Sequence, residues 1–414
     1  MDPKATAALL ALVLCSSLAG CFGSREPIRI LSIGAVLPAD SPIVSILEPE
    51  PAAVQTLVPT RRASEMEPDV AKRYVRLYFP KTAEILQEYD FVLYAAAPDV
   101  RPLTVTQVDM LRRATEGGTP ALADQGGISS SEAFRQAWIA SGLHEMFPND
   151  ASSVLSQGVE HSLGASTFTI DVREESGLPP VLTPFADLGI EGIVVSHGWH
   201  VVPKQGSRIW AEMEGLFPER GIEYPWLFSI TYQEGLTWNL GDNFVSSFWG
   251  TFYGECRNPY RTDVLMNIIY YSTGRELPED ILQVHRQREG FADYLEQRRF
   301  LLGLIEFADN FGANTAPIHA GVEEADAVEA DAEELYLEQE YELCQATMEE
   351  AFAMLSELGD TAVRAKDQAL FWVYLSEWLA TTATLIVSGL VVHQLMVRRV
   401  LYAPARTTTL VERE

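Results

Sequence analysis

The sequence predicts an α/β fold: a flavodoxin-like, mostly parallel sheet with helices on both faces, followed by a C-terminal helical stalk and one transmembrane helix. Short runs such as Ile28–Ala35 and Phe91–Ala97 are apolar without polar alternation, which is typical of strands buried on both faces. Segments of helical periodicity separate these runs, as in a parallel sheet with helical crossovers. Trp378–Val397 holds about 20 residues without formal charge, which matches one bilayer crossing.

The first half of the chain alternates expected strands with expected helices. Thr104–Thr115 is amphipathic and is closed by Gly117 and Gly118, a helix stop signal. Ser129, with Glu132 three residues later, has the pattern of a capping box. The expected strands are Ile28–Ala35, Ala53–Pro59, Phe91–Ala97 and Thr119–Ala123, and the expected helices are Asp69–Tyr89 with a break at Pro80, Thr104–Thr115 and Ser129–Leu143.

The pattern changes after Pro148, where strands become more frequent than helices. Pro225–Leu240 has the pattern of a β-meander that turns at Gln233-Glu234-Gly235. The other expected strands are Ser166–Val172, Ile193–Val202 and Arg208–Glu214, and the expected helices are Thr262–Tyr271 and Pro278–Ile305.

These elements suggest an order of domains along the 414 residues. The α/β domain is expected to span residues 27–275, because the strand and helix alternation lies within that range. The remaining parts are a signal peptide at 1–21, a helical extension at 276–320, an acidic helical stalk at 321–370, a transmembrane helix at 378–397 and a cytoplasmic tail at 398–414.

The N-terminus has the pattern of an export signal. Lys4 is followed by the apolar run Ala5–Leu18 and then by small residues. Leu18-Ala19-Gly20-Cys21 resembles a lipobox, in which Cys21 becomes the lipidated first residue of the mature chain. The alternative is ordinary cleavage after Ala19, with Cys21 incidental.

The charges beside the C-terminal apolar segment predict its orientation. Arg398, Arg399 and Arg406 follow the segment, and the positive-inside rule places them in the cytoplasm. An exported N-terminus agrees with that orientation. We therefore expect a single-pass protein of the cell membrane with the lipid bilayer as a partner, its bulk extracytoplasmic and its C-terminus cytoplasmic.

Composition excludes several classes of function. The chain has 30 Lys and Arg against 58 Asp and Glu, a net charge of −28, so it would be repelled by a nucleic-acid backbone. It has only 4 cysteines, too few for a disulfide-dense scaffold or a Cys-rich zinc module. Neither a P-loop nor a GxGxxG motif is present, and we expect no cofactor.

The segment at residues 90–130, DFVLYAAAPDVRPLTVTQVDMLRRATEGGTPALADQGGISS, resembles the core of the class I glutamine amidotransferase-like superfamily, and most of all its membrane-linked group. Gln107, Gly117 and Gly118 fit the pattern of that core. Residues 137–150, 201–214 and 225–242 resemble its later segments, and the likeness covers roughly residues 30–275. The resemblance implies a strand that runs into a glycine elbow, where the nucleophile of the family stands.

The elbow of this chain reads Asp124-Gln125-Gly126-Gly127 and has neither Cys nor Ser at its apex. In the family, glutamine hydrolysis needs a Cys thiolate there, activated by a His. No Cys occurs between residues 22 and 255, so we expect a degenerate elbow without catalytic residues.

Other residues offer weaker routes to chemistry. Ser129, Ser130 and Ser131 stand where helix caps belong and not at the apex of the elbow, where a nucleophile would stand. His197 and His200 would face opposite sides of an expected strand, so we expect no metal site. The expected function is binding or assembly by a catalytically silent amidotransferase-like domain. The alternative is a membrane-bound hydrolase or amidotransferase-like enzyme whose nucleophile the sequence does not reveal.

The stalk combines an acidic linker with a coiled-coil pattern. Residues 301–360 contain no Lys or Arg, and from Leu337 to Ala362 apolar residues recur with a/d spacing. The seam either packs within the chain, with Cys256 and Cys344 as a possible disulfide, or mediates self-association through 337–362. Glu-rich flanks disfavour a parallel pair of copies. Other membrane or cell-surface proteins are further expected partners.

Overall fold

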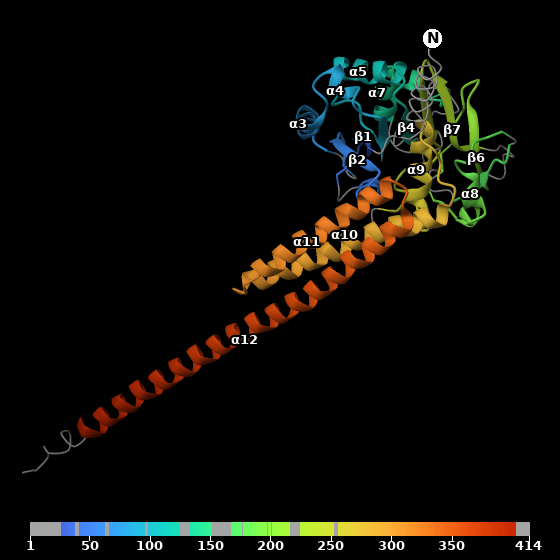
Figure 1. Cartoon of the computed structure of the whole chain (residues 1–414). Coiled ribbons are helices and arrows are strands. Elements are labelled where there is room, and N and C mark those ends of the chain that lie inside the picture. Colours follow the sequence, from blue (N-terminus) through green and yellow to red (C-terminus); the bar gives the residue numbers. More distant parts are fainter. Residues whose placement is uncertain are drawn as a thin grey trace, which may run out of the picture. The chain divides into compact units, whose positions relative to one another are not determined.

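The computed structural model describes residues 26–37, 41–62, 66–95, 98–124, 132–150, 167–175, 177–196, 198–199, 201–215, 224–251 and 256–402. Its core is an eight-stranded mixed sheet in the order β2-β1-β3-β4-β8-β7-β6-β5 (Figure 1). The strands are β1 (Ile28–Gly34), β2 (Ala53–Pro59), β3 (Phe91–Ala95), β4 (Ala121–Asp124), β5 (Thr169–Val172), β6 (Arg208–Glu214), β7 (Tyr224–Tyr232) and β8 (Gly235–Leu240).

The sheet has a parallel half and an antiparallel half. The strands β2, β1, β3, β4 and β8 pair in parallel. The strands β8, β7, β6 and β5 pair antiparallel, and the register of β6 against β7 shifts near Ala211. The predicted α/β class is confirmed.

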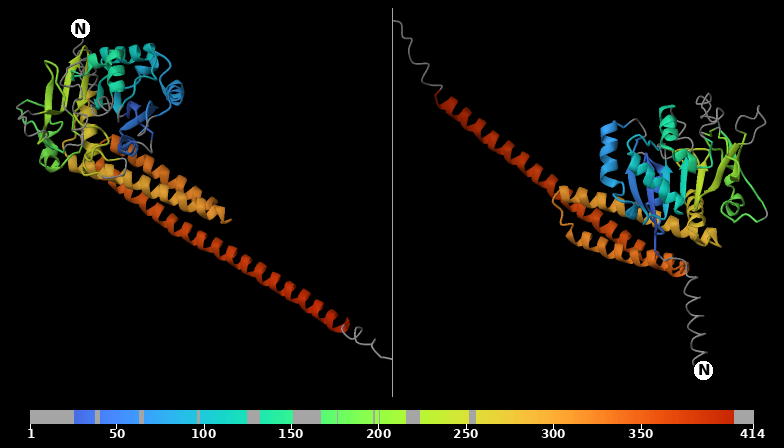
Figure 2. Two further views of the ribbon diagram at one scale, coloured as in Figure 1. Left: turned by 180° about the vertical axis from the view of Figure 1, so that it is seen from behind. Right: turned by 90° about the horizontal axis from the view of Figure 1, so that it is seen from above.

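Helices cover both faces of the parallel half. Tyr94 of β3, Ala123 of β4 and Asn239 of β8 are aligned across neighbouring strands, so Trp238 points to the opposite face. The ring of Tyr94 contacts Trp138 of a helix on the first face, whereas Trp238 contacts Tyr271 of a helix on the second. The ribbon views in Figure 2 show helices on either side of the strands.

The first group of helices alternates with the strands or directly follows β8, and three longer helices come later in the chain. The helices that follow the first five strands and β8 are α2 (Pro42–Leu47), α3 (Pro68–Tyr78), α4 (Ala83–Leu86), α5 (Val105–Glu116), α7 (Glu132–Ser141), α8 (Thr183–Ala186) and α9 (Arg261–Ser272), with 3-10 turns η1 (Leu143–Met146) and η3 (Ile190–Gly192). Three long helices complete the described chain: α10 (Ile281–Asn310), α11 (Ala316–Leu337) and α12 (Tyr341–Tyr402).

Most expected elements form within a few residues of their predicted bounds. The break at Pro80 separates α3 from α4. The predicted strand Ile193–Val202 is wrong: its described residues form only an isolated bridge between Phe168 and Val195. Val194 is 44% exposed, so this apolar run is not a continuous buried strand.

A capping box begins α5. The Thr104 hydroxyl accepts a hydrogen bond from the Gln107 N–H at 3.3 Å, and the Gln107 side chain accepts one from the Thr104 N–H at 2.9 Å. This reciprocal arrangement satisfies two otherwise unpaired donors of the first turn. Gln107, which fits the family pattern, therefore has a structural role here.

The chain divides into two compact units. The first contains residues 1–292 and 333–345, and the second contains residues 293–332 and 346–414. Within the second unit, Arg298 of α10 forms two 2.7 Å bonds to Asp326 of α11. A Cβ on Gly321 of α11 would lie 2.5 Å from Leu358 of α12, which shows how closely those helices approach.

The apolar seam of α12 is buried within the single chain. Its buried members are Cys344, Met348, Ala351, Leu355 and Ala362. Further along, α12 is the one described helix long and apolar enough to cross a membrane, and none of its most apolar window is buried. Large exposed side chains there include Trp372, Trp378 and Leu385.

A buried ionic cluster joins distant parts of the first unit. The Arg288 guanidinium donates to Glu50 at 2.5 Å and to Asp263 at 2.8 Å. All three residues are at most 4% exposed, and His285 lies 2.7 Å from Asp263. The pKa of His285 is raised, first by its hydrogen bond to Asp263. Arg288 of α10 therefore links α9 to the turn before β2.

Replacing Arg288 by Met should lower the free energy of unfolding by about 3–5 kcal/mol, because two carboxylates remain buried without their cation. Arg29→Met is the matched control: it breaks the pair with Glu88, in which both side chains are 55% exposed, and should cost less than about 1 kcal/mol. Denaturant unfolding of the detergent-purified chain measures both. Equal losses would contradict the importance of the buried cluster.

Candidate functional site

The parallel strands end at one edge of the sheet, where open α/β folds bind ligands. Asp124 is the last residue of β4 and lies opposite Leu240 of β8. Of the predicted elbow, Gln125, Gly126 and Gly127 lie outside the described residues, as do Ser129, Ser130, Ser131, His197, His200 and Cys21. The site can therefore be built from Asp124 and the side chains that follow β3 and β8.

Two fully buried carboxyl groups stand at this edge. Asp124 accepts a hydrogen bond from the Phe244 N–H at 3.3 Å. Asp242, two residues beyond β8, accepts one from the Ser246 hydroxyl at 2.9 Å and one from the Trp249 indole at 3.4 Å. Burial raises the pKa of Asp242 to about 8, and the charge of Asp124 contributes in the same direction. Asp242 is therefore mainly protonated at neutral pH.

Aromatic rings occupy the space around Asp242. Trp226 stacks on Trp249 with ring centroids 6.2 Å apart and planes at 13°. Phe244 and Phe248 each lie 5.0 Å from Trp249, and all four rings are buried. This part of the edge is packed as a core and is not lined as a sugar-binding platform.

Two arginines, one after β2 and one after β3, meet one ring at the same edge. The guanidinium carbons of Arg61 and Arg101 lie 4.3 and 4.5 Å from the ring centroid of Phe134, on α7. Arg101 also binds Asp99 through both carboxylate oxygens, at 2.9 Å for each of the two shortest contacts. These contacts order the loop after β3 and place Arg101 beside the start of α5.

The two described cysteines lie outside this edge. Cys256 is exposed, and its thiol donates to the carbonyl oxygens of Asn258 at 3.3 Å and Phe248 at 3.6 Å. Cys344 is buried on α12, and burial raises the pKa of its thiol to about 11. Both are free thiols, so the bridge expected between them is not formed in the structure. No group of three metal-binding side chains occurs among the described residues.

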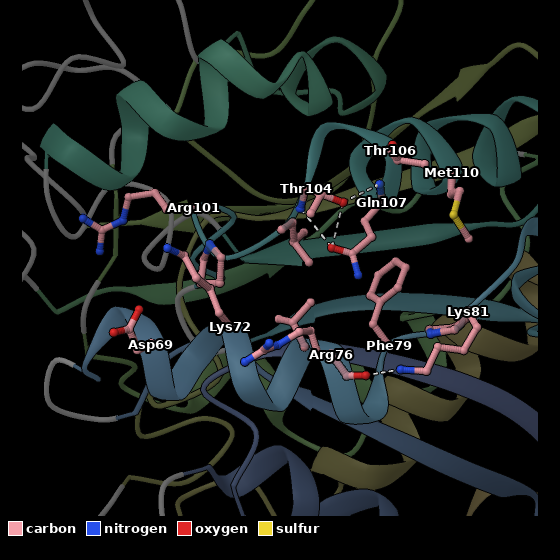
Figure 3. A pocket seen from close by; sticks show the side chains of 14 residues that line it. Asp69, Lys72, Arg76, Phe79, Lys81, Arg101, Thr104, Thr106, Gln107 and Met110 are labelled. Carbon is pink, nitrogen blue, oxygen red and sulfur yellow. Dashed lines mark hydrogen bonds between the residues drawn. The ribbon is translucent and has the colours of Figure 1, made fainter.

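A cavity of about 830 Å³ opens between α3 and α5 (Figure 3). Its base includes the buried side chains of Val75 and Phe79. The apolar residues Pro80, Pro102, Leu103 and Met110 also line the cavity. The charged and polar lining residues are Asp69, Lys72, Arg76, Lys81, Arg101, Thr104, Thr106 and Gln107. The sequence analysis missed this cluster, although Lys72 and Arg76 stand four residues apart on one helix face.

The chain is similar to solved structures at low sequence identity. No family model matches the chain, and no curated protein matches it. Solved structures similar to it include the cytoplasmic proteins STM3548 and STM1381 of Salmonella typhimurium, each 15% identical over 59% of this chain and 99% of theirs, with TM-scores of 0.40 and 0.41. A ThuA-like protein of Parabacteroides merdae is 12% identical over 62% of this chain and 94% of its own, with a TM-score of 0.34.

The fold and the edge geometry define an α/β protein with a mixed sheet and a carboxyl edge partly filled by core side chains. The structural similarities, all with TM-scores below 0.5, add no assignment of family or activity to that class.

Asp242→Asn should remove a pH dependence of stability. The unfolded chain releases this proton near pH 4, its ordinary value, and the folded chain near pH 8, so the free energy of unfolding falls as pH rises between them. The stabilisation of Asp242→Asn relative to the parent protein should therefore grow from pH 5 to pH 8. Thermal unfolding at several pH values measures it, with the exposed Asp187→Asn as a control for loss of one charge. A pH-independent difference would contradict the buried neutral acid.

Proposed function

We propose that the chain is a membrane-anchored extracytoplasmic protein whose amidotransferase-like domain is catalytically silent and acts by binding or assembly. The observation that carries the proposal is the end of β4: the strand ends in Asp124, and the sequence has no Cys between residues 22 and 255. Glutamine hydrolysis of the resembled kind needs a thiolate directly after this strand.

The contacts of Asp124 and Asp242 support the proposal that the domain is catalytically silent. The Asp124 carboxylate holds the Phe244 backbone, and Asp242 is neutral at physiological pH because it is buried. Asp242 is fully buried, and its carboxyl oxygens accept hydrogen bonds from Ser246 and Trp249, so this group is not presented to a substrate. The two carboxyl groups thus have structural partners in the positions where an active site would hold reactive groups.

The C-terminal helix supports membrane anchoring. Its apolar segment is unburied, begins near Trp372 and Trp378, and is followed by Arg398 and Arg399. Tryptophans at one end and cations at the other match the two interfaces of a bilayer. With the expected export signal at 1–21, this orientation would place the α/β domain outside the cytoplasm.

The topology has a direct test. Protease added to intact cells should degrade the 30–365 portion and spare an epitope tag placed after Glu414, because only the tag would be cytoplasmic. Immunoblotting against both parts measures the outcome. Lysed cells provide the control, since there the tag should also be lost. Protection of the α/β domain in intact cells would contradict the proposed topology.

A separate experiment tests whether the chain hydrolyses glutamine. The detergent-purified chain should release no more ammonia from glutamine than buffer does, because no thiolate follows β4. Cys256→Ser is the matched variant, since Cys256 is the exposed described thiol. Ammonia release above background would contradict the proposal. If Cys256→Ser abolished that release, Cys256 would be the nucleophile; if the release survived, another group would be.

A further inference from the structure

The geometry points to a binding site for a phosphate monoester with an apolar body in the cavity between α3 and α5. The inference deepens the proposed binding function, on which it rests, by naming a ligand class. Three properties carry it: the cations Lys72 and Arg76 on one wall, the apolar part of the lining and the polar start of α5 opposite (Figure 3).

The cations of this cavity are unusual for the chain. The protein has a net charge of −28 and only five lysines, yet Lys72 and Lys81 both line this one cavity. Neither Lys72 nor Arg76 forms an ion pair with any residue that the structure describes, and Lys81 donates to the Arg76 carbonyl oxygen. Asp69 is the single acid in the lining.

Lys72 and Arg76 place two positive charges on one face of α3. Lys72 and Arg76 stand four residues apart on α3, and like charges at that spacing repel and weaken a helix. An anion between them would relieve the repulsion. A phosphate monoester carries close to two negative charges at pH 7, and its oxygens suit the forked guanidinium of Arg76.

The opposite wall offers donors, and the lining also offers apolar contact. Thr106 and Gln107 belong to the first turn of α5, where the helix dipole favours negative charge, and Thr104 is the N-cap, whose hydroxyl bonds to Gln107. The amide nitrogen of Gln107 points toward Phe79 in the cavity (Figure 3). Val75 and Phe79 close the cavity and are each 2% exposed, whereas Leu103 and Met110 are partly exposed in the lining and offer apolar contact. Together these walls fit a charged head and an apolar body.

Calorimetric titration of the full chain in a neutral detergent tests the inference, with phenyl phosphate as the probe. Phenyl phosphate should bind more tightly than inorganic phosphate, which lacks the apolar body, and than benzoate, which has a single charge. Trimethylphenylammonium, with the opposite charge, should not bind. Equal affinity for benzoate, or binding of the cation, would overturn the ligand class.

Variants of the lining residues test whether phenyl phosphate binds in this cavity. Lys72→Gln with Arg76→Gln should weaken phenyl phosphate binding about tenfold or more, the equivalent of one hydrogen bond to a charged group. Arg73→Gln removes one charge from the same helix outside the cavity lining and should leave the affinity unchanged. Equal effects of the two changes would overturn the proposed site.

Gln107→Glu is a second variant, chosen because it changes the charge of the cavity without removing a residue that stabilises α3. Arg76 lies in the last turn of α3, where its charge also suits the helix dipole, so its removal could weaken the helix. Glu at position 107 can still complete the capping box with Thr104, but it brings a negative charge to the cavity. The affinity for phenyl phosphate should fall while the melting temperature is kept. An unchanged affinity would overturn the inference.

The outcomes also separate this inference from the proposed function. Ammonia release from glutamine, together with cavity binding of phenyl phosphate, would overturn catalytic silence and leave the ligand class intact. A chain that is silent toward glutamine but does not bind phenyl phosphate would leave silence intact and overturn the ligand class.

Discussion

The fold of the first unit depends on one buried cation. Arg288 is held between Glu50, which lies 238 residues earlier, and Asp263 of α9, and all three side chains are removed from water. Taking such charges out of water is costly unless each finds its partner, so the cluster forms only when α9, α10 and the turn before β2 are all in place. The ring of Phe291, one turn along α10, contacts Tyr336 and ties residues 333–345 to the same unit.

The carboxyl edge of the sheet shows how one architecture separates packing from binding. Near β8, Trp226 and Trp249 enclose Asp242 and leave it neutral. On the other side of β4, between α3 and α5, the unit keeps an open cavity in which Lys72 and Arg76 form no ion pair with any described residue. The same edge therefore has one part that is packed as a core and another part that stays open.

Much of the sheet followed from local pattern, because apolar runs such as Phe91–Ala95 are buried on both faces. Ile193–Val202 has apolar residues at both ends, but its described residues form no continuous strand pairing, and short apolar runs alone do not distinguish these cases. Gln107 carried a local signal of its own, since Thr104 three residues earlier completes a capping box. The raised pKa of Asp242 and the partners of Arg288 had no such signal, because both depend on residues far apart in the sequence.

The antiparallel half ends in β5, a strand of only four residues, next to a register shift between β6 and β7. A long, regular sheet edge would offer unpaired backbone groups to another molecule and invite intermolecular strand addition, whereas a short edge beside an irregular ladder gives little template for it. This protection against aggregation matters most where copies are crowded. Any tether to a bilayer confines its molecules to two dimensions, so the short outer strand would help neighbouring copies to remain separate.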